Sequence, residues 1–299
     1  MAAGATLCWP DAHALRYRRH RHDDGSPFTD VASTYEFLSP NLRDRESAED
    51  FEFPVEYMFK DVPKADIGEG VDPVAVTLHN MDTYGVRQGM VNVGNEDREA
   101  PRRAVREFPE RFLPCIDVDP RHGMDAVRRI KSFHDEWGVV AVTSFPAGAL
   151  VAINDAPYYP IYAACVELDI PIFLTAGVPG PRVPLKTQKV EHLDEVCWFF
   201  PELTIVMRHG AEPWEELAVK LMLKWPNLYY STSAFAPKYY PRAIIDYANT
   251  RGADKVMYGG YFPMGLTLER IFSELPDVPL RDEVWPKFLR HNAARVLGI

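Results

Sequence analysis

The sequence predicts one parallel α/β domain, a (β/α)8 TIM barrel. Two observations lead to this prediction. Short apolar, β-rich runs alternate with amphipathic stretches of about 10–15 residues, the spacing of βαβ units in a parallel sheet. In addition, a chain of 299 residues with 46% hydrophobic residues can bury one large core, and α/β barrels often use such a length for a single domain. In this fold the chemistry lies at the C-terminal ends of the strands.

Eight strands, with helices between them, are expected in chain order. The expected strands are residues 29–32, 89–93, 112–118, 139–144, 172–175, 204–208, 228–231 and 256–259. The amphipathic stretches include residues 73–84, 123–136, 158–168, 193–199, 215–224 and 240–250. Each such stretch can return the chain to the start of the next parallel strand.

Two regions lie outside this alternation. Residues 1–28 fit no periodic pattern, and we expect a flexible N-terminal extension there, followed by the barrel over residues 29–299. His20 and His22 have the spacing of a metal-binding H-x-H pair, but they lie in a charged segment with no apolar strand before it. We therefore do not expect them to bind a metal. Residues 33–72 form a long connection after the first expected strand, rich in charged and aromatic residues, which is typical of a lid or binding loop.

Composition narrows the classes of partner. A net charge of −10 argues against nucleic-acid binding, and no apolar run reaches the roughly 18 residues of a membrane span. The four cysteines are far apart, so buried thiols in a reducing compartment are expected, and the polar N-terminus lacks the apolar core of a secretory signal. We therefore expect a cytoplasmic protein with a small-molecule partner, and homo-oligomerisation stays open.

Short motifs follow one another in order over most of the chain. They are residues 80–86 (NMDTYGV), 108–112 (FPERF), 117–120 (DVDP), 167–171 (ELDIP), 200–206 (FPELTIV), 208–214 (RHGAEPW), 225–230 (WPNLYY), 256–263 (VMYGGYFP) and 292–297 (NAARVL). In order and spacing the set resembles the amidohydrolase-2 family, the relatives of aminocarboxymuconate semialdehyde decarboxylase. The resemblance spans residues 29–299 and implies a metal-dependent hydrolase barrel.

The resemblance also implies where a catalytic metal would be bound, and this chain departs from the family at three of those four places. Residues 30–36 contain no histidine where the first strand should carry a ligand pair, and Thr175 replaces the histidine that ends the fifth strand. His209 is retained after the sixth strand, and in mononuclear relatives that residue mainly transfers a proton. Tyr261 replaces the aspartate after the eighth strand.

These departures predict a site without a metal and without any other cofactor. A catalytic zinc ion usually has three protein ligands and a water, and neutral hydroxyl groups are weak ligands. The alternative is a relocated metal site built from other acidic or histidine residues, with candidates Glu36, Glu56, Glu212 and His79.

His209 and Tyr261 are the expected catalytic residues. A histidine at this position can titrate near neutral pH and transfer a proton, whereas a phenol can donate a hydrogen bond to a developing oxyanion. The competing interpretations are a structural histidine at the barrel rim and an aromatic side chain that fills the space left by a lost metal. Arg208 is expected to point away from His209 and to form an ion pair.

Three further residues are expected to bind substrate. Thr175 would line the pocket, Tyr35 would assist Tyr261, and Arg182 could clamp a substrate carboxylate from the loop after the fifth strand. A solvated loop arginine is the simpler interpretation of Arg182.

The leading hypothesis is an enzyme that hydrolyses or decarboxylates a small carboxylated, aromatic or polyketide-like substrate by metal-independent acid–base catalysis. The activities in this hypothesis are those that the family resemblance implies. The second hypothesis is an inactive barrel that serves as a ligand-binding or scaffold subunit, and the third is a metalloenzyme with relocated ligands.

Overall fold

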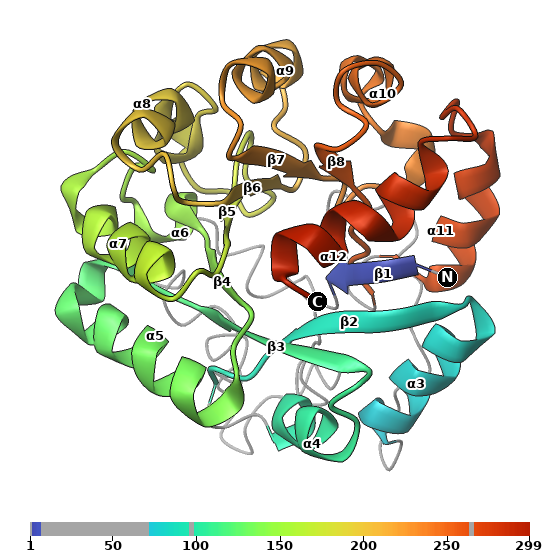
Figure 1. Ribbon diagram of the computed structural model, residues 1–299, viewed down its shortest axis with the longest axis horizontal. Helices are drawn as coiled ribbons and strands as arrows, with labels where there is room; N and C mark the ends of the chain where they lie inside the picture. The colour runs from blue at the N-terminus through green and yellow to red at the C-terminus, as the bar shows by residue number, and fades with distance from the viewer. Residues whose placement is uncertain (1, 7–71, 96–98, 263–265) are drawn as a thin grey trace, which may run out of the picture.

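The computed structural model describes residues 2–6, 72–95, 99–262 and 266–299. Its eight strands pair in parallel in the order in which they occur along the chain, and the sheet curls into a barrel with helices on its outer face (Figure 1). The expected (β/α)8 fold is therefore confirmed. β1 and β8 are the two ends of the hydrogen-bonded order in this part of the chain.

The strands are β1 (Ala2–Thr6), β2 (Val86–Asn92), β3 (Phe112–Asp117), β4 (Ala141–Ser144), β5 (Ile172–Thr175), β6 (Ile205–Arg208), β7 (Leu228–Ser231) and β8 (Val256–Met257). The α-helices are α3 (Pro73–Thr83), α4 (Glu99–Glu107), α5 (Met124–Trp137), α6 (Pro146–Ala149), α7 (Tyr159–Glu167), α8 (His192–Phe199), α9 (Glu215–Lys224), α10 (Arg242–Ala248), α11 (Leu268–Glu274) and α12 (Asn292–Leu297). Short 3-10 helices are η4 (Pro120–His122), η5 (Ala156–Tyr158), η6 (Leu185–Gln188), η7 (Pro237–Tyr239) and η8 (Leu275–Asp277), and η9 (Lys287–His291) is a π-helix.

Seven of the eight expected strands coincide with β2–β8, but the first strand lies elsewhere. Residues Ala2–Thr6 form β1 and pair in parallel with β2, in registers such as Thr6 with Met90. The expectation that residues 1–28 stay outside the barrel therefore differs from the structure at residues 2–6. Small residues such as Ala and Gly have weak strand preference, so this segment carries little local signal. The expected strand at 29–32 and all but the last residue of the proposed lid at 33–72 lie outside the described residues.

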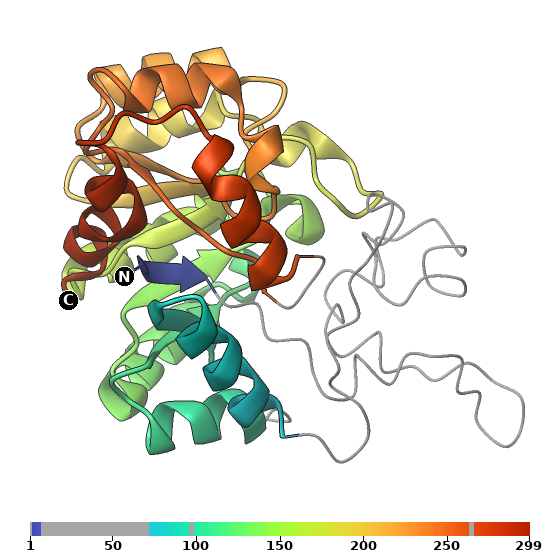
Figure 2. The same cartoon turned by 90° about the vertical axis from the view of Figure 1, so that its right-hand side faces the viewer.

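Alternation along the strands fills the lower part of the barrel with apolar side chains. The cluster comprises Met90, Leu113, Cys115, Ala141, Phe173, Val206 and Met257 from the strands, and Ala293, Val296 and Leu297 from the last helix. α12 thus covers the N-terminal ends of the strands, and the C-terminus lies at the same end (Figures 1 and 2). The opposite end, toward which β1 points in Figure 2, is the end where barrel chemistry is expected.

The described cysteines agree with the expectation of buried thiols. Cys115, Cys165 and Cys197 are free and buried. Burial raises the pKa of the Cys197 thiol to about 12, so this side chain behaves as an apolar core residue. Within the described residues, no helix combines the length and apolarity needed to cross a membrane.

Candidate active site at the C-terminal ends of the strands

The inward side chains change character where the strands end. On β3, Leu113 and Cys115 belong to the apolar cluster, and the next inward position is Asp117. Val206 on β6 is likewise followed two residues later by Arg208. Because successive side chains of a strand alternate between faces, Asp117 and Arg208 also face the interior. The upper layer of the barrel therefore carries charge where the lower layer is apolar.

Asp117 and Arg208 meet across the barrel. Nη2 of Arg208 lies 3.8 Å from Oδ1 of Asp117, and the Arg208 side chain is only 11% exposed. β4 and β5 separate β3 from β6 in the sheet, so this ion pair spans the interior. The expected ion pair of Arg208 is present, and it lies inside the barrel.

A threonine holds each member of this pair. Oγ1 of Thr143 donates a hydrogen bond of 2.6 Å to Asp117, and Nε of Arg208 donates one of 3.2 Å to Oγ1 of Thr175. Burial raises the pKa of Asp117, and the Arg208 charge and the Thr143 hydrogen bond partly offset that effect. Asp117 is thus a carboxylate whose charge depends on its neighbours.

His209 follows β6 in a turn with unusual backbone angles. Its φ is 66°, and Gly210 and Ala211 have φ values of 106° and 62°. A Cβ on Gly210 would lie 2.6 Å from the ring of Phe235, so only glycine fits at this position. Left-handed backbone at non-glycine residues is costly and clusters at functional sites, which makes this turn a candidate for chemistry.

The imidazole of His209 is held on two sides. Nδ1 lies 3.0 Å from Oγ of Ser233, and the ring packs edge-on against Tyr261 with centroids 4.9 Å apart. Burial lowers the pKa of His209 well below its usual value, the Arg208 charge lowers it further, and a hydrogen bond to the Ser233 backbone opposes both. His209 is therefore neutral at neutral pH, in contrast to the near-neutral titration that its sequence position suggested.

Tyr261 reaches His209 because the turn before it passes very close to β7. A Cβ on Gly259 would lie 2.3 Å from Oγ of Ser231. Glycine at this position lets the chain after β8 approach the end of β7. The two residues that the sequence proposed as catalytic are thus in contact with each other.

The other sequence-predicted residues have different locations. Thr175 is buried, and its Oγ1 accepts the hydrogen bond from Nε of Arg208 in the barrel interior. Arg182 is exposed in the segment between β5 and η6. Tyr35 lies outside the described residues. Glu212 lies just before α9, and burial together with the nearby Glu215 raises the pKa of its carboxyl.

Sequence reasoning missed Asp117 as a site residue. It noted this residue only within a family motif, although period-two alternation from Leu113 would have placed it inside the barrel. Ser233 had no signal at all, because its contact with His209 joins two loops.

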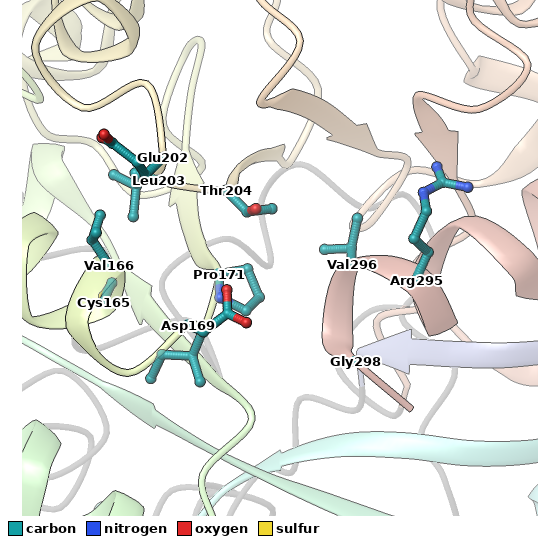
Figure 3. A pocket seen from close by; sticks show the side chains of 11 residues that line it. Cys165, Val166, Asp169, Pro171, Glu202, Leu203, Thr204, Arg295, Val296 and Gly298 are labelled. Carbon is teal, nitrogen blue, oxygen red and sulfur yellow. The ribbon is translucent and has the colours of Figure 1, made fainter.

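The N-terminal end of the barrel has a pocket of its own. It has a volume of about 120 Å³ and is lined by residues of the α7–β5 connection, the approach to β6 and the C-terminal segment (Figure 3). Asp169, Glu202 and Arg295 supply its charged groups. This pocket lies at the end of the barrel that usually serves stability, so it is not the candidate active site.

Comparison with known proteins identifies the family. The family model for amidohydrolases matches residues 13–299. The chain belongs to the amidohydrolase family. No curated protein sequence matches it.

Solved structures agree with this assignment at the level of the fold. An uncharacterized TIM-barrel protein from Bordetella bronchiseptica is 23% identical, with a TM-score of 0.70 over 88% of this chain and 92% of that chain. 5-Carboxyvanillate decarboxylase from Novosphingobium aromaticivorans, with manganese and 4-hydroxy-3-methoxy-5-nitrobenzoic acid, is 17% identical, with a TM-score of 0.63 over 100% and 95%. Dihydroxybenzoic acid decarboxylase from Polaromonas sp. JS666, with manganese and 2-nitroresorcinol, is 17% identical, with a TM-score of 0.56 over 89% and 93%.

The manganese in these relatives contradicts the expectation that this chain works without a cofactor. That expectation relied on replacements at single positions, and a protein can supply metal ligands from other segments. The described residues do not fit a metal by themselves, since they contain no group of three or more His, Cys, Asp or Glu that could hold an ion. Two of the earlier candidates, Glu36 and Glu56, lie outside these residues.

Proposed function

We propose that this amidohydrolase is an enzyme that hydrolyses or decarboxylates a small carboxylated substrate, with an aromatic carboxylate as the leading class. The observation that carries the proposal is the contact of His209 with Tyr261 beside an interior arginine, at the catalytic end of the barrel. The substrate class is supported by decarboxylases of the same fold. These proteins are named after aromatic carboxylates, and their structures contain aromatic carboxylates or analogues as bound ligands.

In this proposal His209 moves the proton. Nδ1 is engaged by Ser233, so Nε2 is the atom that we assign to proton transfer. The lowered pKa keeps the ring neutral, so His209 first accepts a proton, from water in hydrolysis or from a substrate hydroxyl in decarboxylation. In decarboxylation it then returns that proton to the carbon that loses carbon dioxide.

Tyr261 and Thr175 have supporting roles. The phenol of Tyr261 donates a hydrogen bond to the oxygen on which negative charge develops, and its ring fixes the plane of the imidazole. Thr175 orients Arg208 through the Nε hydrogen bond. Tyr35 and Arg182 stay proposed substrate contacts.

The test is a turnover assay on the purified full-length chain. Hydroxylated benzoates and their esters are incubated with the protein, and carbon dioxide release and ester cleavage are followed separately. The protein is assayed as purified and with added manganese, and its metal content is measured in parallel. Turnover of a benzoate that requires His209 supports the proposal. Binding of these compounds with no turnover in either state contradicts it and favours a ligand-binding barrel.

A further inference from the structure

The interior guanidinium of Arg208 has hydrogen-bonding capacity that the described protein does not use. A guanidinium carries five N–H donors. Among the described residues, Arg208 makes one hydrogen bond, from Nε to Thr175. Its Nη groups have only the contact with Asp117, which at 3.8 Å is an ion pair and too long for a hydrogen bond.

This arrangement is costly unless another group completes it. Arg208 is 11% exposed, so water satisfies few of its donors. Unsatisfied donors on a buried charged group destabilise the folded protein. Asp117 does not fill the gap, because its Oδ1 accepts the hydrogen bond from Thr143 and lies 3.8 Å from Nη2 of Arg208, beyond hydrogen-bond distance. The two Nη groups therefore present a planar, fork-shaped donor set at the end of β6.

We infer that Arg208 binds the carboxylate of the ligand inside the barrel, and that Asp117 holds the guanidinium in position when no ligand is bound. This inference deepens the proposed function and rests on it for the class of ligand. A carboxylate matches the two Nη groups of a guanidinium in a bidentate pair, which a lysine could not form. The inference assigns to Arg208 the role that the sequence suggested for Arg182, which is exposed.

The position of Arg208 also links carboxylate binding to catalysis. Arg208 immediately precedes His209, and its charge is one cause of the lowered histidine pKa. A carboxylate that neutralises Arg208 removes that cause. A ligand anchored there is therefore next to the residue that we propose moves the proton, and its binding makes that residue a better proton acceptor.

Asp117 gives the inference a second, independent signature. A ligand carboxylate on Arg208 would lie near the Asp117 carboxylate and be repelled by it. The charged groups that act on Asp117 are Arg208, Asp119 and Arg129, and the Arg208 charge also acts on His209. Since the pKa of Asp117 is already raised by burial, the approaching anion favours its protonated form. Binding of a carboxylate should therefore strengthen as the pH falls from neutral to mildly acidic values.

The experiment measures binding of benzoate, the simplest aromatic carboxylate, to the full-length protein by calorimetry and by ligand-observed NMR. Benzamide is the neutral control. Arg208→Gln should weaken benzoate binding roughly 10- to 100-fold, the weight of hydrogen bonds to a charged group, and leave benzamide binding unchanged. The affinity of Arg208→Lys for benzoate should lie between that of Arg208→Gln and that of the wild type. The matched control is Arg128→Gln, at a surface arginine of α5 that is 68% exposed, and it should bind benzoate like the wild type.

The Asp117→Asn variant distinguishes the inference from a simple loss of folding. Its benzoate affinity is expected to rise, whereas misfolding would lower it. This variant should bind benzoate more tightly and without the pH dependence. The double variant Arg208→Gln/Asp117→Asn replaces the ion pair by two neutral amides and should fold but not bind benzoate selectively. Melting curves verify that each variant is folded.

The outcomes distinguish this inference from the proposed function. Binding needs no turnover, so His209→Asn should still bind benzoate. Unchanged benzoate binding in a folded Arg208→Gln variant overturns the inference. An Arg208-dependent benzoate site in a protein that turns over no substrate would support the inference and contradict the proposed enzyme.

Discussion

The two ends of the barrel are built from the same strands but from opposite kinds of side chain. At the N-terminal end, Phe173 and Val206 pack with α12 in an apolar layer. Two residues further along the same strands, Thr175 and Arg208 bond each other. The two layers are one inward position, about 7 Å, apart along each strand. The first layer stabilises the fold, and the second carries the polar side chains that can bind a ligand and take part in a reaction. Mutations at the two ends should therefore affect different measurements.

The largest effect is expected at the C-terminal end. His209→Asn removes the proposed proton acceptor and should lower kcat by roughly 10²–10⁴, the usual weight of general acid–base catalysis. Its melting temperature should change little at neutral pH. The pH–rate profile of the wild type should follow one titration that is absent in the variant. An unchanged rate would make His209 a structural residue and would favour the inactive-barrel hypothesis.

At the N-terminal end, Phe173→Ala should act on stability instead. Phe173 is 3% exposed in the apolar layer, and loss of a buried phenylalanine typically costs about 3–5 kcal/mol. Chemical unfolding measures the change. The folded fraction should keep its activity, because Thr175 lies one inward position further on. Thr175→Val is the matched variant of the upper layer, and a larger loss of stability there would contradict the separation of the two layers.

Deletion of residues 1–6 tests whether β1 belongs to the barrel. These residues include the strand that pairs with β2, so their removal exposes the edge of β2 and breaks ladder hydrogen bonds of about 1 kcal/mol each. We expect a melting temperature lower by several degrees, at about 2–4 °C per kcal/mol for a chain of this size class. An unchanged melting temperature would support the sequence-based expectation of an extension that adds little to the core.

Acid should destabilise the C-terminal end through His209. Its folded-state pKa is lowered, so the unfolded chain binds the proton more readily, and stability is lost as the pH falls below the unfolded value of about 6.5. The loss is at most about 1.4 kcal/mol per pH unit for one proton. Unfolding free energies of wild type and His209→Asn at several pH values measure it. If the unfolding free energies of the two proteins depend on pH in the same way, burial does not lower the pKa of the His209 imidazole.

The smallest effect is expected for Tyr261→Phe. The ring that packs on His209 remains, and only one hydrogen bond to developing charge is lost, so kcat should fall by about tenfold, less than for His209→Asn. Steady-state kinetics on the same substrate measure this difference. A loss as large as that of His209→Asn would give the phenol a direct part in proton transfer.

Local sequence patterns were sufficient for most of the fold. Seven strands fall where apolar β-rich runs predicted them, because strand and helix periodicities are properties of short segments. β1 escaped prediction because Ala2–Thr6 is made of small residues and owes its strand conformation to pairing with β2. The sequence also predicted that His209 and Tyr261 lie beyond the ends of strands, because the order of the motifs placed them there.

The sequence by itself determined seven of the eight strands and which of their ends carry polar residues. Only the tertiary structure decided which of those residues meet. Asp117 and Arg208 are 91 positions apart along the chain and form an ion pair because the curled sheet brings β3 and β6 to opposite sides of one interior. His209 is neutral because burial in the folded protein lowers its pKa, and the Arg208 charge lowers it further. Such contacts depend on curvature and burial of the whole sheet, which no short segment encodes.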